Sequence, residues 1–508
     1  MKNLLKSLIL LTIVFQLLFT TAGKAQGIDT EKVTLGLKSE SLETAIKKIE
    51  ALTSFRFFYH DMDVRPLAHL NLTPGTRTIE QTLDELLQNT TLYYRQIDGN
   101  ILLERKRQQV SFEITGRVVD SLGKKPVANA SVFLSKTIVG AKTADDGVFT
   151  LQNIKPGKYD LVVSIIGYGT YIQTTTVSSS NITLPDIIIS PKTIALKEVT
   201  VKPLTDAARE KDYELFKAEF VGTSELANEC KILNPEILDL DYDEKGHILT
   251  ASSPDFLEIE NAALGYKIKY LLANFKLDYS ALAKFRLDYK GSVLFEEMKG
   301  TPAQQKRWQK RRRQVYEGSV MHFLRAALND SIGLEGFRVL RLERYENPER
   351  PADSLIEAKI ESCKRSETAG RRDSLSFWTK KARLPKLIEK LTPIPLSKND
   401  IITPQNKQGL FALGPGSDDE ALYVTYNKNR HFYINIQATY VDNPNNSETS
   451  IINFIAPYAF FDRNGWLEPN SVAFTGVWGR NRVADLLPID YETKEMAGQG
   501  IKNISNQP

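Results

Sequence analysis

The stretch that decides the fold of this chain is residues 114–171, ITGRVVDSLGKKPVANASVFLSKTIVGAKTADDGVFTLQNIKPGKYDLVVSIIGYGTY. Short runs rich in Val, Ile, Phe and Tyr alternate here with turn residues, at intervals of roughly 8–12 positions. Residues 145–147 (Asp-Asp-Gly) and 155–158 (Lys-Pro-Gly-Lys) are turn sequences, because Gly, Pro and Asp suit the backbone angles of tight turns. This spacing predicts a small β-sandwich.

The same stretch resembles the carboxypeptidase regulatory-like domain. Four motifs carry the resemblance together: the opening Gly-x-Val at Gly116, the Asp-Asp-Gly-x-Phe turn ending at Phe149, the Pro-Gly before a hydrophobic strand, and Ile-Gly-Tyr at 166–168. The resemblance implies a transthyretin-like antiparallel β-sandwich over residues 112–201. In carboxypeptidases this domain is an accessory without peptidase residues, so the resemblance implies a rigid spacer and not a catalytic domain.

Residues 28–106 combine strand and helix patterns. Apolar and polar residues alternate at 33–37, as in a half-buried strand, and apolar residues at 42–52 recur at helical spacing. A second helix is expected after Thr78 and Gln81, which make a capping box. An Asp-Gly hairpin signal lies near the end of the segment. The predicted order is β-α-β-β-α-β-β.

This segment resembles the short secretin and TonB N-terminal domain, called the STN domain. The resemblance covers VTLGLKSESLETAIKKIEALTSFRFFYH at 33–60 and HLNLTPGTRTIEQTLDELLQNTTLYYRQIDGNILLERK at 69–106. Known members are periplasmic, and some precede the plug of TonB-dependent outer-membrane receptors and pass a signal to an anti-sigma regulator. The resemblance implies a protein–protein contact. We expect His60 and His69 to be structural or exposed residues and not metal ligands.

The N-terminal residues 1–25 show the three-part pattern of a cleaved secretory signal peptide. Lys2 and Lys6 form the positive region, an apolar run follows, and Gly23 and Ala25 are the small residues before the cleavage point. The alternative is a transmembrane anchor, which needs about 20 apolar residues. Without residues 1–25 the net charge falls from +4 to +1. We expect an exported protein in the periplasm or peripheral at the outer membrane, with no transmembrane segment after cleavage.

The sandwich ends in IALKEVTVKPL at 194–204, which is similar to the segment leading towards the plug of TonB-dependent receptors. The residues that follow are too few for a plug and a barrel of about 22 strands, and they lack serial alternating strands. The chain therefore resembles an exported Bacteroidetes-type protein that has the front end of such a receptor without plug or barrel. Residues 202–215 are charged and predict a helical connector.

Residues 216–508 predict one large, β-rich α+β domain of unknown function. Strands are expected at several apolar and aromatic runs, among them 337–342 and 355–360. Apolar residues at helical spacing predict one helix over 303–328. The runs LEIENAALGYKIKYLL and RWQKRRRQVYEGSVMHFLRAAL resemble the C-terminal region of poorly characterised exported proteins, which implies no mechanism.

Composition excludes several classes of protein. Hydrophobic residues are 42% and charged residues 25%, as in ordinary globular proteins. The net charge of +4 is small for a dedicated nucleic-acid-binding protein. Two Cys are too few for a disulfide-rich scaffold or a Cys-based zinc module, and five His offer few candidates for His-based catalysis. The sequence contains no nucleophile elbow, no phosphate-binding loop, no dinucleotide-binding glycine motif and no zinc-protease helix motif. We therefore predict no catalytic residue, metal ligand or cofactor.

Six cations and two cysteines are the candidate site residues. The cations lie within eight residues: Lys306, Arg307, Lys310, Arg311, Arg312 and Arg313. An anionic lipid headgroup, an acidic glycan or an acidic protein face would suit them, and the alternative is a solvated helix face. Cys230 and Cys363 are a candidate disulfide, since the compartment that an exported protein reaches permits disulfides. Two separate thiols are the alternative.

The expected fold class is multidomain: a small α+β STN-like domain, an antiparallel β-sandwich, and a large β-rich α+β C-terminal domain. The expected function is a non-enzymatic interaction or signalling module, linked to TonB-dependent uptake or its regulation. An envelope protein would bind the STN-like domain, and nucleic acid is not an expected partner. One alternative is an envelope hydrolase acting on glycan or peptide through an unrecognised site in 216–508. Another is a structural element of the envelope anchored through the basic helix.

Overall fold

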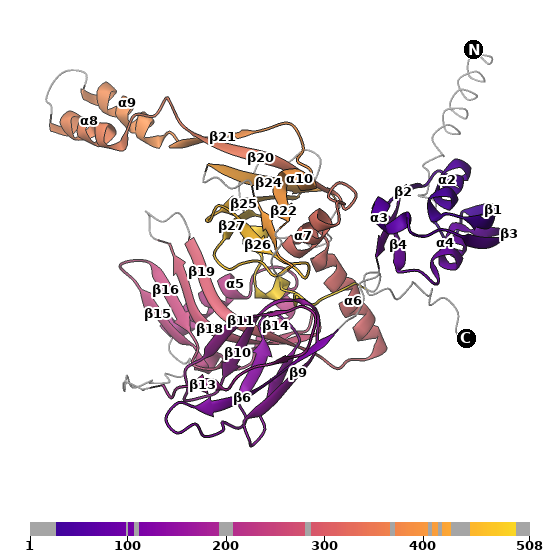
Figure 1. Ribbon diagram of the computed structural model, residues 1–508. Coiled ribbons are helices and arrows are strands. Elements are labelled where there is room, and N and C mark those ends of the chain that lie inside the picture. The colour runs from indigo at the N-terminus through magenta and orange to yellow at the C-terminus, as the bar shows by residue number, and fades with distance from the viewer. Residues whose placement is uncertain are drawn as a thin grey trace, which may run out of the picture. The chain divides into compact units, whose positions relative to one another are not determined.

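The computed structural model describes residues 27–97, 100–105, 111–192, 207–279, 286–365, 371–404, 409–414, 419–427 and 448–493 (Figure 1). The expected signal peptide, residues 1–25, lies outside this described part, as does the segment at 194–204. The chain divides into two compact units, Met1–Gln109 with Glu492–Pro508, and Val110–Tyr491. Among the described residues, no helix is both long enough and apolar enough to cross a membrane.

The first unit contains two longer helices packed against two small sheets. Its elements in chain order are β1 (Lys32–Glu40), α2 (Leu42–Leu52), β2 (Arg56–Phe58), α3 (Asp61–Val64), β3 (Leu70–Thr78), α4 (Ile79–Leu87), β4 (Leu92–Ile97) and β5 (Asn100–Arg105). β1 pairs antiparallel with β3, while β5 lies between its parallel neighbour β2 and its antiparallel neighbour β4. The order of strands and helices is the one expected from the sequence, with the one-turn helix α3 added.

The apolar faces of α2 and α4 meet the strands in one core. At the start of α4, Thr78 and Gln81 form the expected capping box, each side chain bonding the backbone of the other residue. His60 and His69 are exposed, and His69 Nδ1 lies 2.8 Å from Ser39 Oγ. The two histidines therefore lie outside the core, as expected.

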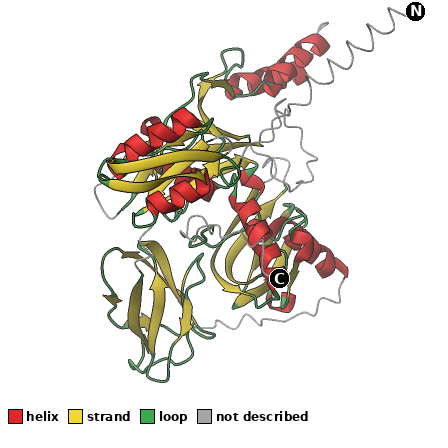
Figure 2. Ribbon diagram, turned by 90° about the vertical axis from the view of Figure 1, so that its right-hand side faces the viewer, coloured by secondary structure: helices red, strands yellow, loops and turns green. Residues whose placement is uncertain are grey.

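Residues 111–192 form a sandwich, and Figure 2 shows this part as strands and loops. The strands are β6 (Phe112–Asp120), β7 (Ser131–Leu134), β8 (Gly140–Lys142), β9 (Val148–Ile154), β10 (Gly157–Ser164), β11 (Tyr171–Val177), β12 (Ile182–Thr183) and β13 (Ile187–Ile189). One sheet has the order β11-β10-β7-β8, and in the other β6 is flanked by β9 and by β12 with β13. β12 and β13 run parallel to β6, so the sandwich is not wholly antiparallel, because the chain crosses between the sheets after β11.

The rest of the second unit is rich in strands. These are β14 (Cys230–Ile232), β15 (Asp239–Asp243), β16 (Ile248–Ser252), β17 (Phe256–Asn261), β18 (Tyr266–Asp278), β19 (Arg286–Glu297), β20 (Phe337–Glu346), β21 (Leu387–Leu391), β22 (Ile402–Pro404), β23 (Phe411–Leu413), β24 (Glu420–Tyr426), β25 (Glu448–Phe454), β26 (Ala459–Phe461) and β27 (Val472–Gly476). The helices are α5 (Ala207–Phe220), α6 (Pro302–Tyr316), α7 (Val320–Leu328), α8 (Asp353–Arg365), α9 (Arg371–Arg383) and α10 (Lys398–Ile401). Short 3₁₀ helices cover Ala227–Glu229, Pro235–Ile237, Trp478–Arg480 and Val483–Asp485.

These strands form three sheets. One has the order β14-β17-β18-β16-β15, with β19 also paired to β18; the second is β21-β20-β24-β25-β27, and the third is β22-β23-β26. α5 covers the first sheet, where Phe216 and Phe220 pack against Phe275 of β18 with ring centres 4.9 and 6.2 Å apart. The expected β-rich α+β architecture is therefore confirmed.

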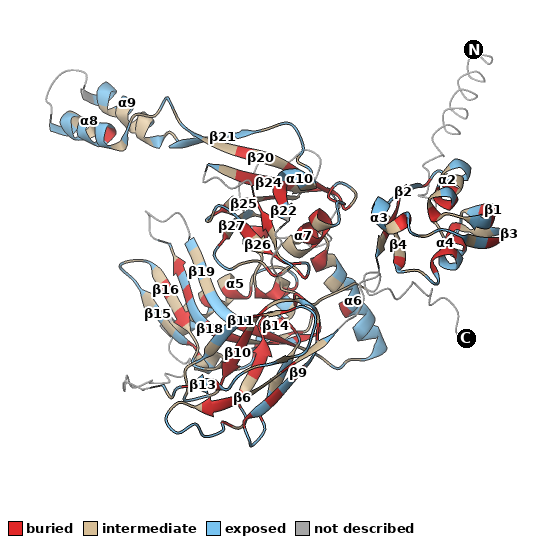
Figure 3. Ribbon diagram, viewed as in Figure 1, coloured by how far each residue is buried: buried red, intermediate tan, exposed pale blue. Residues whose placement is uncertain are grey.

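Two local predictions are wrong. The helix expected over 303–328 is divided into α6 and α7, because Gly318 at φ +74° interrupts it and Ser319 caps the second helix. The strand expected at 355–360 is part of α8, whose sequence is rich in the helix formers Leu, Ala, Glu and Lys. α8 and α9 pack against each other, and Figure 3 shows most of their surface as exposed.

The sandwich shares its core with the rest of the second unit. Trp466 and Ile489 are buried in the same hydrophobic cluster as the inward-facing residues of the sandwich strands. On the other side of β7, Phe133 packs against Leu271 of β18 and Leu294 of β19. The sandwich is therefore packed against the rest of the second unit and shares hydrophobic clusters with it.

The turn DRNGW at 462–466 fastens this junction by hydrogen bonds. Asp462 Oδ2 accepts the backbone N–H of Lys158 at 2.9 Å, and Asn464 Nδ2 donates to the carbonyl of Pro156 at 2.7 Å. Asp462 Oδ1 accepts three further backbone N–H groups within its own turn. One carboxylate thus holds both the turn and its partner strand.

Asp462→Ala is expected to lower the free energy of unfolding of the chain by about 3 kcal/mol, because four backbone N–H groups lose their acceptor at a buried position. Asp462→Asn retains a carbonyl oxygen and should cost less. Chemical unfolding measures both variants, with the exposed Asp186→Ala as control. Equal stability of the Asp462→Ala and Asp186→Ala proteins would contradict the role of this carboxylate.

Candidate functional site

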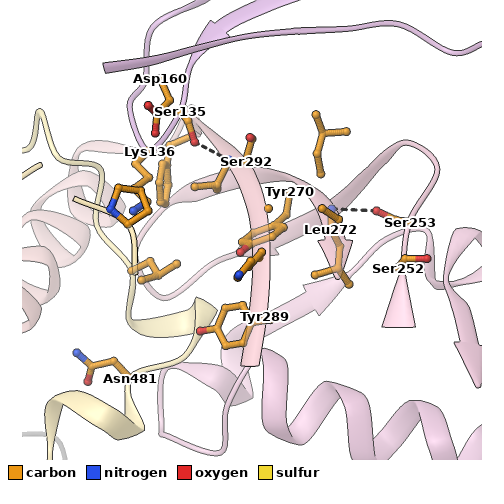
Figure 4. Close-up of a pocket in the computed structure, with 18 of the residues that line it drawn as sticks. Ser135, Lys136, Asp160, Ser252, Ser253, Tyr270, Leu272, Tyr289, Ser292 and Asn481 are labelled. Atoms are coloured by element: carbon orange, nitrogen blue, oxygen red, sulfur yellow. Dashed lines mark hydrogen bonds between the residues drawn. The ribbon is translucent and has the colours of Figure 1, made fainter. Parts of the chain in front are cut away.

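A pocket of about 1210 Å³ lies in the second unit, between the sandwich and the paired strands β18 and β19 (Figure 4). Figure 4 shows Ser135, Lys136 and Asp160 grouped at one side, and Ser252 and Ser253 at another. Ligand pockets in proteins usually measure about 300–1,000 Å³, so this pocket has room for a small organic molecule.

Most of the pocket wall is apolar. The apolar and aromatic lining residues include Ile172, Leu238, Tyr270, Leu272, Tyr289, Phe474, Trp478, Leu487 and Ile489. Burial raises the pKa of both Tyr270 and Tyr289, so their hydroxyls stay neutral. The wall can therefore bury an apolar ligand surface without leaving a charged tyrosinate beside it.

The β18–β19 side of the pocket is shaped by close backbone packing. A Cβ at Gly291 of β19 would lie 2.2 Å from the carbonyl oxygen of Leu271 and 2.4 Å from the Tyr270 ring, so only glycine fits there. β18 bulges just after Leu272, and Ser253 Oγ accepts the Leu272 N–H at 3.1 Å. This irregular stretch keeps its backbone groups satisfied while it forms part of the wall.

Lys136 belongs to the loop between β7 and β8 and has φ +64°. This left-handed conformation costs a non-glycine residue roughly 1–3 kcal/mol and persists only where the surroundings hold it. Here the Lys136 N–H donates to the Val293 carbonyl at 2.6 Å, and the Lys136 carbonyl accepts the Ile489 N–H at 2.8 Å. The loop is thus bound from two sides by the rest of the unit.

Burial lowers the pKa of Lys136, and the Asp160 carboxylate opposes this effect only in part. Much of the Lys136 surface is accessible, but it belongs to the pocket wall, where surrounding protein desolvates the ammonium. Among the described residues, the Lys136 ammonium has no hydrogen-bond or ion-pair partner, and Asp160 accepts a hydrogen bond from Thr174 Oγ1 at 2.9 Å. A second lining cation, Arg209, donates through Nη2 to the Leu238 carbonyl at 2.9 Å, while its Nε has no partner in the described part.

The six cations expected as a patch lie on α6, and its arginines have carboxylate partners. The pairs are Arg307 and Arg311 with Glu229, Arg312 with Glu297, and Arg313 with Glu317. Arg312 also lies 3.8 Å from the centre of the Tyr266 ring. Lys306 and Lys310 are exposed and make no ion pair with a described residue. These two lysines are the part of the cluster left for an anionic partner.

The two cysteines of the candidate disulfide are both free. Cys230 is buried in β14, its Sγ lies 3.3 Å from the Leu226 carbonyl, and burial raises its pKa to about 12. Cys363 lies on α8, an element apart from that sheet. The pair therefore does not form a bridge here, and the buried Cys230 is an unreactive thiol.

The described part of the chain contains no group of three or more His, Cys, Asp or Glu side chains arranged to hold a metal. The buried His322 of α7 accepts the Gly318 N–H at Nδ1 over 2.9 Å and faces Glu335 Oε2 at 3.1 Å through Nε2. Both ring nitrogens are thus used at the break between α6 and α7, which assigns His322 a structural role.

A smaller cavity of about 390 Å³ lies beside the sandwich, with Asp490 in its wall. Burial raises the pKa of Asp490 to about 6, although Oδ2 accepts the Ile138 N–H at 3.3 Å. Asp490 is the only acid among the described lining residues. A glycosidase site uses two carboxyl groups roughly 5–9.5 Å apart, so this cavity does not supply such a pair.

Sequence reasoning missed Lys136, Arg209 and the pocket. Lys136 lies in LSKTIVG at 134–140, an ordinary strand end, and its backbone partners Val293 and Ile489 are far along the chain. No local pattern marks such a site.

Residues 114–201 match the model of the CarboxypepD_reg-like domain family, which confirms the expectation for the sandwich. No curated protein matches the chain.

Several solved structures share a slight similarity with part of the chain. A type II cohesin–X-dockerin complex of Acetivibrio cellulolyticus is 16% identical over 16% of this chain and 58% of that chain, with a TM-score of 0.15. The group B streptococcus pilus 2b backbone protein is 17% identical over 16% of this chain and 42% of that chain, with a TM-score of 0.15. The 3-chlorocatechol 1,2-dioxygenase of Rhodococcus opacus 1CP is 11% identical over 17% of this chain and 62% of that chain, also at 0.15. Each match spans less than two thirds of the other chain, and similarity this slight carries no argument about function.

Asp490→Asn is expected to change how stability depends on pH. The folded protein binds the Asp490 proton more tightly than the unfolded chain does, because the pKa of this carboxyl is about 6 in the fold against the ordinary 3.8. The stabilisation that the bound proton gives is therefore full below about pH 4 and is lost as the pH rises through 6. The variant should match the wild type at pH 4 and exceed its free energy of unfolding at pH 7 by up to about 3 kcal/mol. Urea unfolding at both pH values measures this, with Asp186→Asn as control. A difference that does not change with pH would rule out the raised pKa.

Proposed function

We propose that this protein is an exported, non-enzymatic binding module of the cell envelope, working beside TonB-dependent uptake or its regulation. In this proposal the STN-like first unit contacts an envelope protein, and the second unit holds a small molecule in the pocket between the sandwich and β18–β19. The observation that carries the proposal is the pocket itself, a space of about 1210 Å³ whose wall is largely apolar and also carries polar and charged side chains.

The construction of the pocket supports a binding role. Its walls are paired strands and loops held by backbone hydrogen bonds, among them the loop at Lys136 and the bulge at Leu272. A preformed wall loses little conformational entropy when a ligand enters, which favours affinity.

The surface of the first unit supports a protein contact. Leu52, Phe58 and Met62 have exposed fractions of 58%, 40% and 81%, and they follow one another along α2, β2 and α3. They are the large apolar side chains that the described part of the first unit exposes, and a protein partner would cover such surface. The STN resemblance implies contact with a regulator protein. We therefore expect such a protein to bind at these residues.

A hydrolase acting on glycan or peptide is the second candidate, and one observation favours it. Ser135 and Lys136 both line the pocket, and a lysine of lowered pKa can act as the base for a serine nucleophile that lies within hydrogen-bond reach. Ser135 Oγ accepts the Val293 N–H at 3.2 Å, a structural use of the hydroxyl that favours the binding role. Labelling of Ser135 by a fluorophosphonate, absent in Ser135→Ala, would establish the hydrolase instead.

Ligand binding is tested with the neutral apolar probe N-phenyl-1-naphthylamine. We expect saturable binding that Ile172→Trp weakens about tenfold or more, because the indole would fill space in the pocket that Ile172 lines. Ile188→Trp is the matched control, since Ile188 is an exposed sandwich residue outside the pocket lining. Fluorescence titration measures both. Probe affinity that is absent, or equal in the two variants, would overturn the binding role of the pocket.

The protein contact is tested by cross-linking and pull-down of the full chain from its own envelope. Phe58→Asp with Met62→Asp should remove a specific cross-linked partner, because two charges would enter an apolar contact. Leu122→Asp, which alters an 85% exposed leucine of the sandwich, should leave that partner in place. A partner profile that does not depend on Phe58 and Met62, or on residues 28–106 as a whole, would overturn this part of the proposal.

A further inference from the structure

We propose that the pocket binds an amphipathic molecule with a single anionic head group, placed with that group at Lys136 and its apolar chain against Tyr270 and Tyr289. The inference rests on the proposed function, since it names the ligand class of the same pocket. Lys136, the apolar wall and the strained loop each contribute one step to it.

The first step is electrostatic. An anionic group brought to a lysine that protein surrounds in a pocket gains more from their attraction than it would in open water, because the effective dielectric constant there is lower. The Lys136 ammonium makes no hydrogen bond or ion pair with a described residue, and the attraction of the nearby Asp160 carboxylate offsets the effect of burial on its pKa only in part. A ligand anion would supply the missing partner.

The wall carries other charges as well. The acids Glu236 and Asp239 and the lysines Lys192 and Lys290 also line the pocket and are exposed. Much of the Lys136 surface is accessible too, but the protein that surrounds its ammonium lowers its pKa. Arg209 donates to the Leu238 carbonyl through Nη2, while its Nε has no partner in the described part. Lys136 is the lining lysine whose backbone is held in a strained conformation, and we place the anionic group beside it.

The second step concerns the rest of the ligand. The wall away from Lys136 carries most of its exposed surface on apolar atoms, with Tyr270, Leu272 and Tyr289 shown at the centre of Figure 4, and polar residues such as Ser252, Ser253 and Asn481 lie among them. Burying apolar ligand surface there contributes about 25 cal/mol per Å². One anionic end and one apolar body match the two parts of the wall.

The third step is the backbone at Lys136. A glycine or asparagine would adopt φ +64° at lower cost, yet a lysine stands there with its backbone bound on both sides. The bonds to Val293 and Ile489 fix the position of its Cα and so limit where the ammonium can lie. A strained residue held in this way is typical of a site that positions a side chain.

The test compares dodecanoate, dodecyl phosphate and dodecanol, which share one chain length and differ in the head group. Isothermal titration calorimetry on the full chain below the micelle concentration should give at least tenfold tighter binding of an anionic probe than of dodecanol. Dodecanoate and dodecyl phosphate distinguish a fatty-acid head from a phosphate head, and tighter binding of either supports the proposal.

Lys136→Met should weaken the anionic probes about tenfold or more and leave dodecanol nearly unchanged, while Lys136→Arg should preserve the preference for an anion. Lys124→Met is the matched control, because Lys124 is a sandwich lysine with φ +52° that does not line the pocket. Equal binding of all three probes, or equal effects of Lys136→Met and Lys124→Met, would overturn the anionic head group and leave the binding function standing. Failure of all three probes and of N-phenyl-1-naphthylamine would overturn the proposed function as well.

Discussion

The hydrogen bonds of the loop between β7 and β8 are the constraint on which the second unit depends. The backbone of Lys136 bonds Val293 on one side and Ile489 on the other, and the Thr137 carbonyl accepts the Phe295 N–H at 2.9 Å. Thr137 also forms a parallel bridge with Leu294, so the loop continues the pairing of β19. Because this loop joins the sandwich to the β18–β19 side, it sets the separation of the two walls between which the pocket lies.

The wall contributed by the C-terminal segment depends on a buried cation. Arg325 of α7 donates to the carbonyls of Asn464, Ile489 and Tyr491, at 2.8 to 3.0 Å. Arg325 is only 3% exposed. Loss of these hydrogen bonds would therefore destabilise the fold, since a buried guanidinium without acceptors is strongly unfavourable. The same segment supplies Trp466 to the sandwich core. α7, the sandwich and the pocket are therefore linked through one stretch of chain.

Local signals in the sequence were sufficient for the sandwich and for the order of elements in residues 28–106. Turn residues, the capping box at Thr78 and the period of apolar residues all act over a few positions, so a single sequence displays them. The break at Gly318 was not visible, because an isolated glycine is tolerated within a helical pattern. The run at 355–360 predicts a strand but lies in α8, since periodicity does not separate short apolar strands from helices. The pocket, and the carboxylate partners of the basic cluster, depend on residues distant in sequence and could not be inferred.

The way Trp466 and Ile489 complete the sandwich core has a consequence for the order of folding. Lys158 and Asp462, which bond across this junction, are 304 residues apart, and closing so long a loop must precede the contacts that stabilise it. The sandwich strands are synthesised early, yet the part of their core that Trp466 and Ile489 cover stays open until the C-terminal segment arrives. During that interval the nascent chain presents apolar strands to its surroundings, the kind of surface on which chaperones act and from which aggregates grow. Completion of this core therefore requires contacts between parts of the second unit that are far apart in the sequence.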